Sequence, residues 1–290
     1  MHLGVVGLGK MGLGIARSLL RSGQSVIVWN RSPAPAEILV REGALRAADI
    51  AEVFQAEAVV TMLSTDASIR ETILESDVLR QARPDVLHMV CSTISVGFAE
   101  ELERLHHKHH LACVSSPVLG RPDVAEAGEL NVLAAGDPAA VDRAIPVLEL
   151  FAKKVWRMGD KAAMANVAKL AANFVLACAI ESMAEACALA RRNGLDANAL
   201  IELFAGTLFA APAYKGYGPV VARQTFEPAG FLLRHGLKDI RQAMELGESS
   251  GAPLPFASVL RDNFIDAIAH GDADKDWSAV SAVAMRRAGL

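Results

Sequence analysis

A lysine inside a long apolar segment is the residue in this chain best suited to acid or base chemistry. Lys169 has Asn166 about one helical turn before it and Asn173 one turn after it, so a helix would place the three polar side chains on one face. The apolar neighbours Val167 and Leu170 disfavour a charged ammonium and favour proton exchange near neutral pH. From spacing alone, a lysine at a helix edge that extends its ammonium into water also explains the pattern.

Six residues near the amino terminus carry a second chemical signal. Gly7-Leu8-Gly9-Lys10-Met11-Gly12 matches the GxGxxG pattern and stands between a short apolar run and an amphipathic stretch. Glycines at these positions allow a tight turn and bring a pyrophosphate close to the first turn of a helix, where free N–H groups face the anion. The glycine pattern alone also occurs in turns that bind no ligand. Here the complete strand, loop and helix context predicts a dinucleotide site.

The segment Asn30-Arg31-Ser32, at the end of the next apolar run, bears on which dinucleotide binds. No acidic residue stands there to bind the ribose hydroxyls, as one does in many NAD sites. Arg31 can form charge-assisted hydrogen bonds with a ribose 2'-phosphate, and Asn30 and Ser32 can donate further ones. We therefore predict NADP(H) as the preferred cofactor, with NAD(H) as the alternative if Arg31 is an ordinary solvated charge. Leu63 and Ser64 are also assigned to the cofactor site.

Short apolar runs that alternate with amphipathic stretches must position these residues. The runs that suit buried strands are Leu3 to Val6, Val26 to Trp29, Val59 to Leu63, Val86 to Val90, Ala112 to Val114, Val132 to Ala135 and Val155 to Met158. Helices are expected over Met11 to Arg21, Ala67 to Leu74, Ala99 to His107 and Pro138 to Phe151. This alternation is typical of a doubly wound parallel sheet.

After Gly159 the pattern changes, because no further strand is expected and the rest of the chain reads as helices. The longest predicted helix runs from Ala162 to Asn193, with Gly194 at its carboxyl cap. The fold class is therefore α/β: a Rossmann domain over 1–159, which binds the dinucleotide, followed by an all-helical domain over 160–290 for substrate binding and dimerisation. The apolar breadth of the long helix predicts a homodimer or higher homo-oligomer.

Composition excludes several classes of function. The 290 residues are 52% hydrophobic and 21% charged with a formal net charge of −4, so the chain lacks the basic stripe that a nucleic-acid binder needs. Lys169, Glu181 and Glu185 interrupt the most apolar segment, which argues against a membrane span. No secretory signal is evident, so we expect a cytoplasmic protein. The four cysteines are widely spaced, which predicts reduced, packed thiols: Cys91, Cys113, Cys178 and Cys187.

A group of histidines near the end of one predicted helix is not expected to bind a metal ion. His106, His107, His109 and His110 surround Lys108, and only His106 and His110 would share a helix face. Because no acid or cysteine completes a site around them in the sequence, we interpret the group as a solvated helix end and predict no metal site.

Several separate motifs together are more specific than any one of them. They are the glycine loop, Ser92-Thr93-Ile94-Ser95, Pro117-Val118, Lys169-Leu170-Ala171-Ala172-Asn173, Lys238-Asp239 and Asp276-Trp277-Ser278. With these motifs the chain resembles, over essentially its whole length, the β-hydroxyacid dehydrogenase family, which includes 3-hydroxyisobutyrate dehydrogenase and the glyoxylate/succinic semialdehyde reductases.

The resemblance implies roles for particular residues. It makes Lys169 the general acid/base and Asn173 a residue that holds the substrate, with no metal ion involved. It places Thr93 against the nicotinamide end of the cofactor and Lys238 over the cofactor. Ser92 and Thr93 are also predicted to bind the substrate. Tyr214, with Lys215 and Tyr217 nearby, lies in a loop region that borders the substrate cleft in the family, although an ordinary core or surface aromatic explains each tyrosine equally well.

Departures from the family pattern affect the substrate site. Val90 replaces a usual aspartate, Val96 replaces a usual proline, and Leu119-Gly120-Arg121 replaces the Ser-Gly-Gly segment that receives a substrate carboxylate. Leu119, Gly120 and Arg121 are kept as predicted substrate-binding residues, and Arg121 either binds an anion or faces solvent.

The sequence therefore predicts an NADP-dependent oxidoreductase that acts on a small β-hydroxyacid or semialdehyde. One alternative is imine reduction on the same scaffold, although the resemblance associates imine reduction with an aspartate or tyrosine at the position of Lys169. The other is a dinucleotide-binding protein without turnover.

Overall fold

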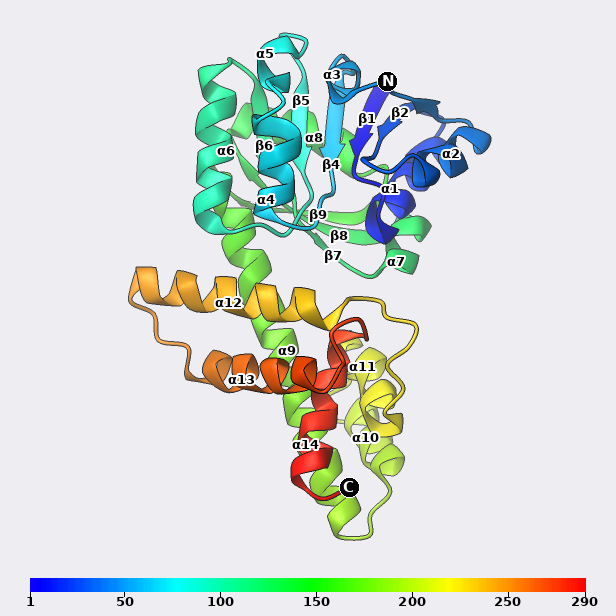
Figure 1. Cartoon of the computed structure of the whole chain (residues 1–290), viewed down its shortest axis with the longest axis vertical. Coiled ribbons are helices and arrows are strands. Elements are labelled where there is room, and N and C mark those ends of the chain that lie inside the picture. The colour runs from blue at the N-terminus through cyan, green and yellow to red at the C-terminus, as the bar shows by residue number, and fades with distance from the viewer. The chain divides into compact units, whose positions relative to one another are not determined.

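The computed structural model describes residues 1–290, and the chain divides into two compact units, Met1–Lys169 and Leu170–Leu290 (Figure 1). Unit 1 contains every strand, and unit 2 consists of helices. The predicted fold class, a Rossmann sheet followed by a helical part, is confirmed. The predicted boundary at 159 falls where β9 ends, shortly before the long helix begins at Ala163, and stays a prediction.

Unit 1 is built on one nine-stranded sheet. The strand order is β3-β2-β1-β4-β5-β6-β8-β7, with β9 also paired to β8. The strands are β1 (His2–Val6), β2 (Ser25–Trp29), β3 (Leu45–Arg46), β4 (Ala58–Thr61), β5 (Leu87–Val90), β6 (Ala112–Ser115), β7 (Val118–Leu119), β8 (Leu130–Gly136) and β9 (Ala152–Gly159). From β3 to β6 all pairs are parallel, so their carboxyl ends meet at one edge.

Helices cover both faces of this sheet. They are α1 (Lys10–Arg21), α2 (Ala34–Arg41), α3 (Ile50–Val53), α4 (Asp66–Ile69), α5 (Val78–Gln81), α6 (Val96–Lys108), α7 (Pro122–Ala127) and α8 (Pro138–Leu148), and a π-helical turn (Arg70–Leu74) follows α4. Along β1, Leu3 and Val5 belong to one buried cluster and Val6 to another. Because side chains alternate across a strand, these two clusters lie on opposite faces, as a doubly wound sheet requires.

The far end of the sheet contains its antiparallel pairs. Strand β8 runs antiparallel to both β6 and β7, and only its pair with β9 is parallel. The physical reason is the short connection between β6 and β8, which contains only β7 and the six-residue helix α7. It has no crossover helix long enough to bring the chain back to the opposite edge of the sheet, so β8 runs antiparallel to β6. The sequence analysis also missed β3 and β7, because two-residue strands show no periodicity.

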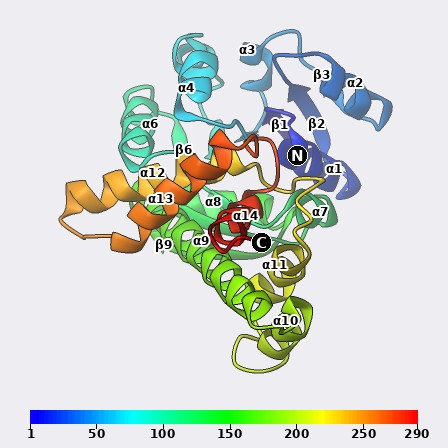
Figure 2. The same ribbon diagram turned by 60° about the horizontal axis from the view of Figure 1, so that its bottom comes forward.

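Unit 2 packs around helix α9 (Ala163–Arg192), which begins in unit 1. The other helices are α10 (Ala197–Gly206), α11 (Pro212–Arg223), α12 (Leu233–Ser250), α13 (Pro255–Ala269), a 3-10 turn (Trp277–Val280) and α14 (Ser281–Arg287). Figure 2 shows α12 and α13 running side by side. The fully buried Trp277 contacts the rings of Phe231, Phe264 and Tyr217, so this indole is the centre of the helical core.

The predicted helix from Ala162 to Asn193 is confirmed within one residue at each end. By length and composition α9 could cross a membrane, and half of its most apolar stretch is buried inside the protein. Its polar residues Lys169, Asn173 and Glu181 are also buried. The four cysteines are free thiols, as predicted, and three of them are buried.

The interpretation of the histidine group as a solvated helix end is wrong for His106, although His107 and His110 are exposed. His106 Nδ1 lies 2.7 Å from the carbonyl oxygen of Leu102, which can only accept, so this nitrogen carries the proton. His106 Nε2 then accepts from His88 Nδ1 (2.8 Å), and His88 Nε2 accepts from the Thr61 hydroxyl (2.7 Å). Burial lowers the pKa of both imidazoles, that of His106 to about 4, so both are neutral.

One cysteine that the sequence did not connect with the histidines lies beside this pair. The candidate ligand atoms of Cys113, His88 and His106 all lie within 4.8 Å of one another, and burial raises the pKa of the Cys113 thiol to about 12. Neutral, hydrogen-bonded histidines and a protonated thiol suit a buried structural cluster. The absence of a metal site stays a prediction.

Candidate active site

The glycine loop joins β1 to α1 at the carboxyl edge of the parallel strands. Gly7 has a φ of +90°, which favours glycine, and a Cβ on Gly12 would overlap the carbonyl oxygen of Gly7. Gly9 precedes the first turn of α1, receives no side-chain cap, and would direct a Cβ into open space. The first turn of α1 is thus open to a ligand, and the loop fits the diphosphate of a dinucleotide.

The side chain of Asn30 connects the glycine loop to the end of β2. The backbone N–H of Leu8 donates to Asn30 Oδ1 (2.9 Å), while the Asn30 amide donates to the carbonyl and hydroxyl oxygens of Ser32 (both 2.9 Å). The side chain of Asn30 therefore holds the loop against the end of β2. Arg31 and the Ser32 hydroxyl are left as the side-chain donors of this segment.

A similar contact fixes the next two strand ends. The N–H of Leu63, after β4, donates to the hydroxyl of Ser92, after β5 (2.8 Å). Ser92 is fully buried, whereas Thr93 and Ser64 are not. The predicted residues after β1, β2, β4 and β5 therefore lie along one edge, the place where ligands bind in doubly wound sheets.

The first turns of α9 are fixed to the same edge within unit 1. The side chain of Asn166 accepts a short hydrogen bond from the Ser115 hydroxyl at the end of β6, and its amide donates to the carbonyl of Ile94 after β5 (3.3 Å). Lys169 follows about one turn later and is only 9% exposed. Lys169 therefore lies one helical turn beyond the residue that joins α9 to the carboxyl ends of β5 and β6, and its side chain is not exposed to solvent.

Asn173 stands one further turn along α9, in unit 2. Its amide donates to Asp239 Oδ2 on α12 (2.6 Å), and the other carboxylate oxygen of Asp239 lies 3.0 Å from Lys238 Nζ. Asp239 is 1% exposed, so this carboxylate fixes the Asn173 amide inside the protein. The sequence analysis quoted Asp239 only as part of a motif and did not assign it to the site.

The remaining predicted residues are placed as follows. Leu119 ends β7, Gly120 adopts a φ of +149°, and Arg121 precedes α7. In unit 2, the ring of Tyr214 on α11 lies tilted by 31° against that of Phe209, with centroids 5.0 Å apart, and Tyr217 is buried. Lys238 lies on α12, also within hydrogen-bond distance of Gln242 (3.5 Å).

Comparison with known proteins decides the family. The model described as the NAD binding domain of 6-phosphogluconate dehydrogenase matches residues 2–159. The model described as the NAD-binding of NADP-dependent 3-hydroxyisobutyrate dehydrogenase matches residues 163–284. The chain belongs to the β-hydroxyacid dehydrogenase family. It is therefore a member of a family of NAD(P)-dependent oxidoreductases, as the sequence motifs predicted.

Several members of the family match over the full length. The chain is 36% identical to the uncharacterized oxidoreductase YfjR of Bacillus subtilis, covering 97% of this chain and 98% of that protein. It is 30% identical to glyoxylate/succinic semialdehyde reductase 1 of Arabidopsis thaliana, covering 97% of each. The crystal structure of 3-hydroxyisobutyrate dehydrogenase from Salmonella typhimurium superposes with a TM-score of 0.87 at 30% identity, covering 98% of this chain and 99% of that one.

For this member of the β-hydroxyacid dehydrogenase family, the geometry supports a nicotinamide dinucleotide cofactor. The open helix end and the glycines of unit 1 suit the diphosphate, and no acidic residue stands at Asn30-Arg31-Ser32.

Proposed function

We propose that this protein transfers hydride between NADP(H) and a small β-hydroxyacid or semialdehyde, with Lys169 as general acid/base. The observation that carries the proposal is the placement of Lys169, which is almost fully buried. It lies one helical turn after Asn166, whose side chain is hydrogen-bonded to Ser115 at the end of β6 and to Ile94 after β5. A carbonyl bound at that edge would have its oxygen beside an ammonium and its carbon beside the cofactor.

Each proposed residue then has one task. The bound nicotinamide supplies or receives the hydride. Lys169 gives a proton to the carbonyl oxygen during reduction and takes the hydroxyl proton during oxidation. Asn173 has one N–H bonded to Asp239 and donates the other to the substrate, because Asp239 fixes the direction of the amide. Thr93 is the proposed contact at the nicotinamide end, and Lys238 the proposed contact from the helical part.

The remaining assignments are proposals of the same kind. Residues 1–159 bind the dinucleotide, and residues 160–290 form the helical domain for substrate binding and dimerisation. We assign Leu119, Gly120, Arg121 and Tyr214 to the substrate. A substrate contact of Ser92 stays a prediction, since its hydroxyl is already bonded to Leu63.

Cofactor preference is proposed from Arg31. Its side chain is 83% exposed and its nearest carboxylate, Glu71, is 3.6 Å away, so the guanidinium can move onto a 2'-phosphate without breaking a close ion pair. NAD(H) lacks this phosphate and is the weaker cofactor in the proposal.

A homodimer in the cytoplasm completes the proposal. Large apolar side chains remain exposed on α9 at Val175 (64%) and Leu189 (68%), and on α13 at Phe256 (68%). A second copy of the chain that packs on these helices would remove them from water.

The experiment that tests the proposal is a substrate panel followed by the absorbance of the reduced nicotinamide. Glyoxylate and succinic semialdehyde are offered with NADPH or NADH, and 3-hydroxyisobutyrate and serine with NADP or NAD. We expect turnover of at least one compound, with a higher kcat/KM for the NADP couple. Turnover of cyclic imines but of no carbonyl compound would favour the imine reductase alternative, and no turnover at all would favour a binding protein.

A further inference from the structure

A small hollow lies at the carboxyl ends of β2 and β3. Its volume is about 150 Å³. Two arginines, Arg31 and Arg46, line it together with the apolar side chains of Trp29, Pro33 and Ala36, and no acidic residue lines it. Pockets for whole small molecules occupy roughly 300–1,000 Å³, so this hollow suits one part of a larger ligand.

The position of Arg46 is fixed by the sheet. Arg46 is the last residue of β3 and pairs in register with Val28 of β2, and the next residue, Ala47, donates its N–H to the Val28 carbonyl (3.0 Å). Arg31 follows β2 by two residues. Both arginines therefore extend from the carboxyl ends of adjacent parallel strands, beside the segment that Asn30 holds to the glycine loop.

Neither guanidinium has a close anionic partner. Arg31 lies 3.6 Å from Glu71 and Arg46 lies 3.9 Å from Glu37, and the two side chains are 83% and 52% exposed. Exposed ion pairs at such distances contribute little to stability. The start of helix α2 also lines the hollow, through Pro33 and Ala36, and adds the positive end of its dipole. The hollow is thus positively charged and both cations can reorient.

We propose that Arg46 is the second arm of a two-arginine receptor for a phosphate monoester on the adenosine ribose. This inference rests on the proposed NADP(H) preference and adds to it a residue that the glycine loop and Arg31 do not reveal. Two guanidiniums can each give paired N–H donors to a dianionic phosphate, and the phosphate replaces Glu37 and Glu71 as their partner. A free ribose hydroxyl carries no charge and gains little from Arg46.

The experiment is calorimetric titration of the full chain with two probes, adenosine 2',5'-bisphosphate and AMP, which differ only in the 2'-phosphate. Arg46→Ala should weaken binding of the bisphosphate about 10-fold to 100-fold, the range for a hydrogen bond between charged groups, and change AMP binding less than about twofold. Arg46→Lys should give an intermediate loss of affinity for the bisphosphate, because lysine keeps the positive charge but lacks the paired N–H donors of the guanidinium. The matched control is Arg41→Ala, an exposed arginine of α2 outside the hollow, which should bind both probes normally.

A second substitution, which should tighten binding of the bisphosphate, strengthens the test. Glu37→Gln removes the carboxylate near Arg46 and should tighten binding of the bisphosphate by up to about threefold, an effect in the range of an exposed charge pair.

The outcomes separate this inference from the proposed function. If the unmodified protein binds both probes with equal affinity, both the proposed NADP(H) preference and the two-arginine phosphate site are wrong. The unmodified protein can prefer the bisphosphate and lose that preference in Arg31→Ala but keep it in Arg46→Ala. In that case the NADP(H) preference stands, and the proposed role of Arg46 is wrong. Equal weakening of both probes by Arg46→Ala would likewise overturn it.

Discussion

At the scale of single residues, the carboxylate of Asp239 decides how Asn173 is presented. It is buried and accepts the Asn173 amide at 2.6 Å. Asp239→Asn keeps the shape but removes the charge, so Asn173 loses a charge-assisted hydrogen bond. We expect kcat/KM for the carbonyl substrate to fall roughly 10-fold to 100-fold with KM raised, and NADPH affinity to fall less, because Asp239 also pairs with Lys238, the proposed cofactor contact. Steady-state kinetics with NADPH titration measure this.

The control for this substitution is Asp274→Asn, an exposed aspartate of unit 2 that pairs with Arg234. It should leave both kinetic constants unchanged. A fall in NADPH affinity equal to the fall in kcat/KM for Asp239→Asn would show that Asp239 acts through Lys238 or the fold and does not position Asn173.

Some of these residues could be predicted from sequence and others could not. Lys169, Asn173 and the glycine loop depend on local spacing along a helix or a strand-to-helix turn, which the sequence displays directly. Asp239 is 66 residues from Asn173, and Arg46 ends a strand of two residues, so nothing local connects either of them to the site. The sequence predicts Asn30 as a phosphate donor, whereas in the structure its amide donates to Ser32.

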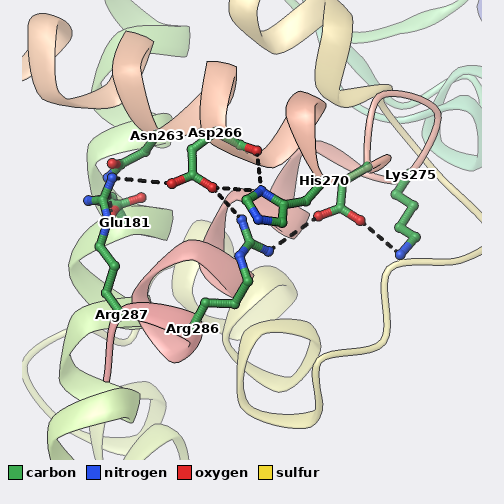
Figure 3. A network of polar contacts seen from close by, with 8 residues as sticks. Glu181, Asn263, Asp266, His270, Lys275, Arg286 and Arg287 are labelled. Carbon is green, nitrogen blue, oxygen red and sulfur yellow. Dashed lines mark hydrogen bonds and ion pairs between the residues drawn. The ribbon is translucent and has the colours of Figure 1, made fainter. Parts of the chain in front are cut away.

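At the scale of elements, the packing of α9, α13 and α14 buries a carboxyl group. Glu181 on α9 accepts the Asn263 amide from α13 (2.6 Å) through one oxygen, and its other oxygen is buried without a hydrogen bond. Figure 3 shows it beside the ion pairs of Asp266 with Arg286 and Arg287, which join α13 to α14. Burial, with a smaller effect from Glu185, raises the pKa of Glu181 to about 7.

This raised pKa predicts a pH dependence of stability. The Glu181 contribution is fully present below the unfolded pKa of about 4.5 and is lost as pH rises through about 7, because the unfolded carboxyl ionises first. The loss is on the order of 3 kcal/mol at pH about 8. Glu181→Gln should therefore melt at a higher temperature than the unmodified protein at pH about 8, and the gain should be absent at pH about 4.5.

Thermal unfolding followed by circular dichroism measures this difference. Glu202→Gln, on the exposed face of α10, is the matched control and should melt like the unmodified protein at both pH values. If the stabilisation by Glu181→Gln is the same at both, Glu181 is ionised in the folded protein and the explanation is wrong.

The order of the strands and helices along the chain could be predicted, but the antiparallel direction of β8 in the sheet could not. The apolar run in β8 reads the same in either direction, and a parallel strand is distinguished from an antiparallel one only by the path of the connection. That path depends on β7 and the short helix α7, neither of which has a periodic pattern. The long helix α9 shows a sustained apolar pattern, so its first and last residues can be predicted to within one residue.

At the scale of the whole molecule, the proposed dimer predicts a measurable mass. Val175 and Leu189 lie about four turns apart on α9 and are both largely exposed. Light scattering of the unmodified protein should give a dimer or a larger assembly, and the double substitution Val175→Asp with Leu189→Asp should give a monomer. Val40→Asp, at an exposed apolar residue of α2, should leave the mass unchanged. A monomer for the unmodified protein at micromolar concentration would contradict the dimer.

The central claim is that Lys169 supplies and removes the proton, and kinetics of Lys169→Ala test it most directly. Without this group, hydride transfer would leave an unprotonated alkoxide in a buried site. We therefore expect kcat/KM for the best carbonyl substrate to fall about 10²-fold to 10⁴-fold, the usual contribution of a positioned general acid, while NADPH titration shows nearly unchanged affinity. If Lys169→Ala keeps a kcat/KM close to that of the unmodified protein, the proton comes from another group and the proposed mechanism is wrong.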